Sequence, residues 1–190
     1  FNNKALNFQG TYTLLSDIIY QTDFSSDPGW QTNNSARYYW DSLAQAYYSE
    51  NYTNSGEYAL VPISYNDGSF HLEVDLKATD RSSLQPGDFV FGLFSQDKTG
   101  HHFAGNSSEH AAILSGGYYD DVIYLEFKSS TGVNQTTSPA ENLLEMNKWQ
   151  HCAIDYDAVT RRVIFSLTRE GNNLFSQALD VPGGFSGNLM

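Results

Sequence analysis

Apolar and polar positions alternate along most of this chain, and helical periodicity is nearly absent. The clearest case is residues 69–79, where apolar side chains occupy one face and the polar His71, Glu73 and Asp75 occupy the other. A period of two is the pattern of a β-strand with one buried face. An Asn-Asp-Gly sequence at residues 66–68 favours a tight turn, so we expect a hairpin whose partner strand is residues 57–63.

Further strands follow from the same alternation, separated by turn residues at short intervals. Residues 88–95 are apolar on both faces and predict a central strand, whereas residues 96–109 and 129–140 are polar and predict long loops. About ten short strands in this arrangement predict an all-β, antiparallel β-sandwich. The remaining predicted strands are residues 11–24, 37–41, 45–51, 122–128, 149–157, 163–169 and 175–181, with 149–157 and 163–169 forming a second hairpin.

The amino-acid composition excludes several classes of partner and structure. The chain has 22 acidic and 10 basic residues, a formal net charge of −12, which argues against nucleic acid as a partner. No apolar run approaches the roughly 20 residues of a membrane span. The single cysteine, Cys152, excludes an internal disulfide and is expected to be a small buried hydrophobe.

The same composition suggests an extracellular or cell-surface protein, because lysine and arginine are few while tyrosine, asparagine, serine and threonine are many. Asn-x-Ser/Thr sequences, the acceptors of N-glycosylation, are compatible with that setting. They occur at Asn33, Asn51, Asn106 and Asn134.

An ordered series of short motifs carries a family resemblance. It runs through the segments 23–30, 37–41, 56–59, 68–75 and 91–94, and ends with Trp149 and Asp155-Tyr156-Asp157. Together these resemble a laminin-G-like jelly roll of the concanavalin A-like lectin/glucanase superfamily. The resemblance covers residues 20–190, and it leaves residues 1–19 as an N-terminal extension or a donor-type strand.

One departure from that family concerns the end of the chain. Such domains usually continue into closing strands, whereas this chain stops at Met190. An exposed sheet edge invites pairing with another chain. Either the sequence is a fragment, or a neighbouring copy completes the sheet with residues 11–22, as in a surface filament or layer built by strand exchange.

The resemblance also raises the question of catalysis. Glucanases of the superfamily carry three carboxylates in a Glu-x-Asp-x-x-Glu pattern, and this chain has Glu73 and Asp75 but Ala78 in the third position. The two acids either serve a glycan hydrolase or lyase or simply form a charged outer strand face. We expect no catalytic residues.

Calcium is the expected ion, because carboxylates and loop carbonyls suit a hard cation and because the resembled superfamily often carries structural calcium. The candidate ligands are Asp23 and Asp27, and Asp120 and Asp121. The alternative is that these aspartates only form turns.

Sugar binding needs aromatic faces beside acids and amides. Tyr118 and Tyr119 follow two glycines and are expected near a turn, beside the Asp120-Asp121 pair. A second candidate is a groove formed by Tyr124 and Glu126 together with His71, Glu73 and Asp75, provided that both strands lie in one sheet. The function expected first is therefore a non-catalytic adhesion or carbohydrate-binding domain, ahead of the filament subunit and the glycan hydrolase or lyase.

Overall fold

The computed structural model of the protein is built from β-strands, and the part of the chain that it describes contains no helix. It describes residues 18, 20–49, 59–61, 63, 68–77, 90–93, 113–119, 122–129, 132–137, 143, 145 and 147–181. This strand content agrees with the predicted all-β class. The strands are β1 (Gln31–Thr32), β2 (Tyr38–Asp41), β3 (Ala46–Ser49), β4 (Ala59–Leu60), β5 (Phe70–Leu76), β6 (Val90–Leu93), β7 (Ile113–Tyr119), β8 (Val122–Ser129), β9 (Gly132–Thr137), β10 (Gln150–Asp157), β11 (Arg162–Arg169) and β12 (Asn172–Asp180).

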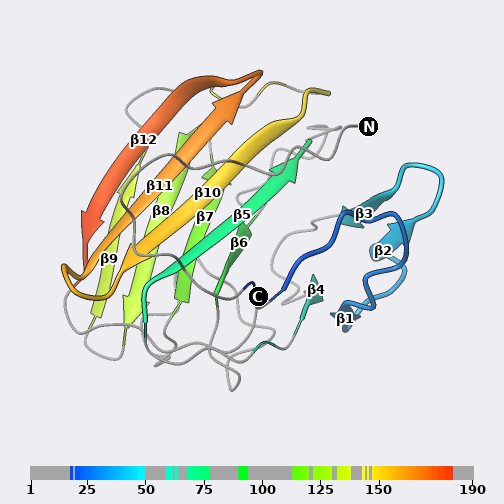
Figure 1. Ribbon diagram of the computed structural model, residues 1–190, viewed down its shortest axis with the longest axis horizontal. Coiled ribbons are helices and arrows are strands. Elements are labelled where there is room, and N and C mark those ends of the chain that lie inside the picture. The colour runs from blue at the N-terminus through cyan, green and yellow to red at the C-terminus, as the bar shows by residue number, and fades with distance from the viewer. Residues whose placement is uncertain are drawn as a thin grey trace.

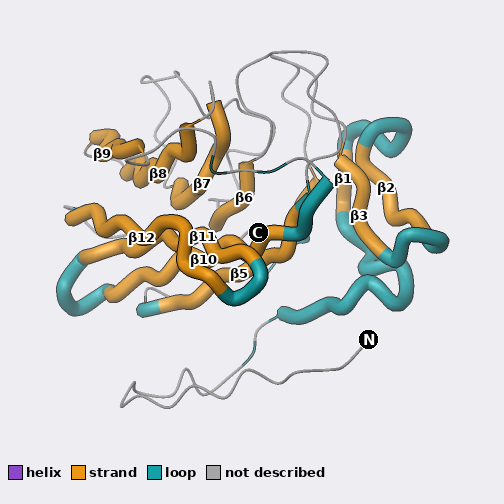
Figure 2. The backbone as a smooth tube through the Cα atoms, turned by 90° about the horizontal axis from the view of Figure 1, so that it is seen from above, coloured by secondary structure: helices purple, strands orange, loops and turns teal. Residues whose placement is uncertain are grey.

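Two four-stranded antiparallel sheets make up most of the described structure. One has the strand order β12-β11-β10-β5 and the other the order β6-β7-β8-β9. The first sheet lies in front of the second in Figure 1, and the perpendicular view in Figure 2 shows them as two layers. Two small antiparallel pairs, β1-β4 and β2-β3, lie beyond the β5 and β6 side of these layers.

The described core is formed by the inward faces of the β12-β11-β10-β5 sheet. In β10, Cys152, Ile154 and Tyr156 are buried, whereas Asp155 and Asp157 are exposed. Apolar residues at every second position therefore share one face of β10, and the neighbouring strands add apolar side chains to the same buried face. Leu93 of β6 packs into the same cluster, so the core lies between the two layers; its other buried members are Val163, Phe165, Leu167, Phe175 and Val181.

The predicted hairpin from β10 to β11 is confirmed, and β12 follows after a second tight turn. Glu170 and Gly171 join β11 to β12 with φ angles of 51° and 79°. Two consecutive positive φ angles define the mirror-image turn that matches the twist of a hairpin, and glycine adopts such angles without steric cost. The strand predicted over residues 175–181 therefore begins earlier, at Asn172, directly after this two-residue turn.

The predicted partner of residues 69–79 is wrong. Residues 57–63 contribute β4, which pairs with β1, and β5 pairs with β10 instead. In that pairing Leu72 and Val74 lie opposite Ile154 and Cys152. The pairing of β5 with β10 extends one apolar face across the sheet. The free energy gained by burying that face exceeds the entropy that a local hairpin would save by closing only a short loop.

Two further expectations are also corrected. Residues 132–137, expected within a Ser/Thr-rich loop, form β9, because pairing with β8 satisfies their backbone hydrogen bonds. The structure also has a strand that the sequence did not predict, β7, in which Gly116 and Gly117 pair with β6 and β8. Finally, β6 is at the end of its sheet among the described strands, not at its centre.

The segments assigned to strand donation fall largely outside the described residues. Of residues 11–22, the structure describes Ile18 and residues 20–22, and none of these is in a strand. Residues 182–190 at the other end are also outside the described part. The division into an extension (1–19) and a domain (20–190), and completion of a sheet by a second copy, therefore stay predictions.

Candidate functional site

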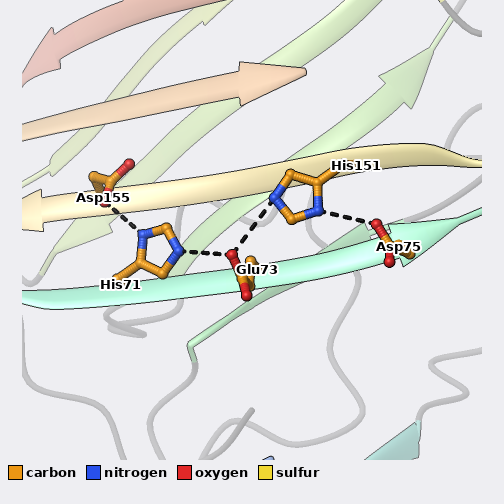
Figure 3. Close-up of polar contacts among 5 residues, drawn as sticks. All are labelled: His71, Glu73, Asp75, His151 and Asp155. Carbon is orange, nitrogen blue, oxygen red and sulfur yellow. Dashed lines mark hydrogen bonds and ion pairs between the residues drawn. The ribbon is translucent and has the colours of Figure 1, made fainter. Parts of the chain in front are cut away.

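Five titratable side chains form a continuous row on the outer face of β5 and β10. Since side chains alternate along a strand, His71, Glu73 and Asp75 share the face of β5 opposite to the core. The register places His71 opposite Asp155, and Asp75 opposite His151. We refer to Asp155, His71, Glu73, His151 and Asp75, in this spatial order, as the carboxylate–imidazole row (Figure 3).

Carboxylates and imidazoles alternate along the row, and a hydrogen bond or ion pair joins each side chain to the next. His71 Nδ1 lies 2.6 Å from Asp155 Oδ1, and His71 Nε2 lies 3.0 Å from Glu73 Oε2. His151 Nε2 lies 3.5 Å from the same Glu73 oxygen, and His151 Nδ1 lies 2.9 Å from Asp75 Oδ1. Glu73 therefore bridges the two histidines, as Figure 3 shows.

This geometry favours the protonated form of both rings. A neutral imidazole donates from one nitrogen only, whereas both nitrogens of His71 and of His151 face carboxylate oxygens. Each ring satisfies both contacts only as an imidazolium. The hydrogen bond to Asp155, opposed by burial and aided by Glu73, raises the pKa of His71 from 6.5 to about 9. The hydrogen bond to Asp75 is the largest cause that raises the pKa of His151.

An exposed aromatic side chain lies at one end of the row. Trp149 directly precedes β10 and is 52% exposed, and Lys77 directly follows β5. The Lys77 ammonium lies 4.9 Å from the centre of the Trp149 ring, a cation–π contact. By the strand alternation, both side chains belong to the same outer face as the row.

The predicted groove that combined His71, Glu73 and Asp75 with Tyr124 and Glu126 is wrong. It required both strands in one sheet, but β5 and β8 belong to different four-stranded sheets. The partners of the β5 residues come from β10 instead, because β10 is the strand that pairs with β5. Tyr118 and Tyr119 end β7 in the second sheet, where Tyr119 pairs with Val122, the first residue of β8.

The sequence reasoning missed Trp149, His151 and Asp155 as members of the site. The alternation in the sequence could have shown this, since these residues occupy every second position, on the outward face, of the predicted strand 149–157. What was lacking was the knowledge that this strand pairs with β5. Cys152, between them in the sequence, points to the opposite face and is fully buried, as predicted.

The aspartates expected to hold calcium are occupied in local turns where the structure describes them. Asp23 Oδ1 accepts a hydrogen bond from the Ser25 amide at 3.0 Å, and Asp27 Oδ1 accepts one from the Gly29 amide at 2.9 Å. The Ser25 contact lowers the pKa of Asp23. Asp120 and Asp121 lie outside the described residues. Within the described ranges, no three His, Cys, Asp or Glu side chains are arranged to hold a metal.

Two of the four glycosylation sequences fall on described backbone. Asn33 is exposed, between β1 and β2, and Asn134 lies within β9. Asn51 and Asn106 are outside the described residues. Occupancy of the four sites stays a prediction.

Comparison with known proteins leaves the function to be argued from the site. No protein-family model matches the chain, and no curated protein sequence matches it. Among the described residues, no helix has the length and apolar character needed to cross a membrane. The carboxylate–imidazole row and Trp149 are therefore the features from which a function can be inferred.

Proposed function

We propose that this protein is a non-catalytic, extracellular jelly-roll domain that serves adhesion by binding carbohydrate, and that the outer face of β5 and β10 is its binding surface. Two layers of four antiparallel strands support a β-sandwich of the jelly-roll kind. The exposed Asn33 within a glycosylation sequence and the surface-type composition support an extracellular setting. Structural calcium at Asp120 and Asp121 remains part of this proposal.

The observation that carries the proposal is the combination of Trp149 with the carboxylate–imidazole row on one open sheet face. An indole ring provides a flat apolar surface for the C–H face of a sugar, and carboxylates accept hydrogen bonds from its hydroxyls. The hydrogen bonds within the row hold Glu73 and both histidines in place before a ligand arrives. Such preorganisation reduces the entropy lost on binding.

A glycan array, followed by titration calorimetry with the best ligand, tests the proposal. We expect binding by the wild-type protein, and a loss of about tenfold in affinity for Trp149→Ala, because the stacking surface disappears. Leu43→Ala is the matched control, since Leu43 is 96% exposed in the β2–β3 turn, away from the row. Absence of binding to every glycan, or equal affinity of wild type and Trp149→Ala, would contradict the proposal.

A further inference from the structure

The carboxylate–imidazole row presents only hydrogen-bond acceptors to a ligand. All four ring N–H groups of His71 and His151 point at carboxylate oxygens within the row. The second oxygens, Asp155 Oδ2, Glu73 Oε1 and Asp75 Oδ2, contact no donor among the described residues. Their side chains are 51%, 40% and 72% exposed. A ligand on this face must therefore supply the donors.

The charge of the row further restricts the chemical class of the ligand. The three carboxylates outnumber the two imidazolium rings of the row, and the Lys77 ammonium balances the remaining negative charge at the Trp149 end, in a chain of net charge −12. Carboxylate or sulfate groups on a glycan would bring further acceptors and like charge. A protonated amine brings three N–H donors and a positive charge, and its hydrogen bonds to carboxylates are charge-assisted.

The Trp149 end of the row already holds an ammonium group, because Lys77 lies over the indole ring, so the acceptors open to a ligand amine are those of the carboxylates. From Trp149 to Asp155 the face spans six residues of β10, or about 20 Å at about 3.3 Å per residue. Acceptors at about every second residue along this length suit a linear ligand with repeated donors.

We infer that the row binds linear glycans with free, protonated amino groups, polymers of glucosamine, more tightly than their N-acetylated counterparts. This inference rests on the proposed function, since it names the ligand class of the same site. Trp149 stays 52% exposed although Lys77 contacts its ring, and this exposed apolar surface beside the acceptors favours a sugar over a lysine-rich peptide.

Titration calorimetry with glucosamine and N-acetylglucosamine oligomers of equal length tests the inference, because the two series differ only in the amine. We expect at least about tenfold tighter binding of the glucosamine series near pH 6, and a weakening with added salt. Glu73→Gln and Asp75→Asn should each remove most of this preference. Asp75 is largely exposed, so its variant keeps the test valid should Glu73→Gln fold poorly. Asp41→Asn, which removes one charge from the separate β2-β3 pair and keeps the acceptor for the Leu43 amide, should leave the preference unchanged.

The outcomes separate this inference from the proposed function. Binding to neither series nor to any arrayed glycan would overturn both. Equal or tighter binding of the N-acetylated series, or of acidic oligosaccharides, would overturn the inference and leave carbohydrate binding intact. An equal loss in Asp41→Asn and Glu73→Gln would show attraction to the general negative charge of the protein, and would overturn the inference. Tighter binding of polylysine of equal charge would indicate a peptide ligand, and would also overturn it.

Discussion

Removing the His71 imidazole should change how the stability of the protein depends on pH. The hydrogen bond to Asp155 raises the pKa of His71 from 6.5 to about 9. A group whose pKa is raised on folding stabilises the folded state fully below its unfolded pKa, near 6.5. That contribution is lost as the pH rises through about 9. His71→Gln keeps a polar side chain but has no proton to gain or lose.

The size of the effect follows from the pKa shift and from the exposure of the partners. At about 1.4 kcal/mol per pKa unit, the rise in the pKa of His71 from 6.5 to about 9 corresponds to at most about 3.5 kcal/mol. Because Asp155 and Glu73 are 51% and 40% exposed, solvent screens the pairing. We therefore expect roughly 1 to 2 kcal/mol of pH-dependent stabilisation.

Urea denaturation of wild type and His71→Gln near pH 6 and near pH 10 measures this quantity. The difference in free energy of unfolding between the two proteins should be roughly 1 to 2 kcal/mol larger near pH 6. Packing lost in the variant affects both pH values equally and cancels. Ile164→Ala is the control, because it truncates a side chain of the same sheet and changes no titratable group. A difference that does not vary with pH, or an NMR titration that places the pKa of His71 at 6.5, would refute the reasoning.

Other predictions address the core, the buried thiol and the β11–β12 turn. Phe165→Ala should lower the free energy of unfolding by about 3 to 5 kcal/mol in urea melts, since Phe165 is fully buried against Phe175. Ile164→Ala, on the exposed side of the same strand, should cost less than about 1 kcal/mol, and equal losses would contradict the assigned faces. Burial raises the pKa of the Cys152 thiol, so it should react with a thiol reagent only after denaturation; rapid labelling of native protein would show that it is accessible. Gly171→Ala should destabilise the hairpin by about 1 kcal/mol because its φ is positive, and an unchanged melting temperature would argue against this turn.

Much of the secondary structure could be predicted from local pattern. Alternation located β5, β8, β10, β11 and most of β12, because a strand at a core must bury every second residue. The same rule placed His71, Glu73 and Asp75 on a common outer face. Where local pattern was weak it failed: β7 contains two glycines and β9 is rich in polar residues, and both are strands because their neighbours pair with them.

The site shows which part of the molecule only tertiary structure decides. The sequence determined the all-β class, the buried Cys152 and the side chains available on each strand face, since these depend on residues close together in the chain. It did not determine that β5 pairs with β10, whose residues lie about eighty positions away. Strand pairing of that kind depends on burying an apolar face that both strands share. The residues of that face are far apart in the chain, so no short segment of the sequence contains them all. That pairing brings Asp155 and His151 to His71, Glu73 and Asp75, and so creates the row.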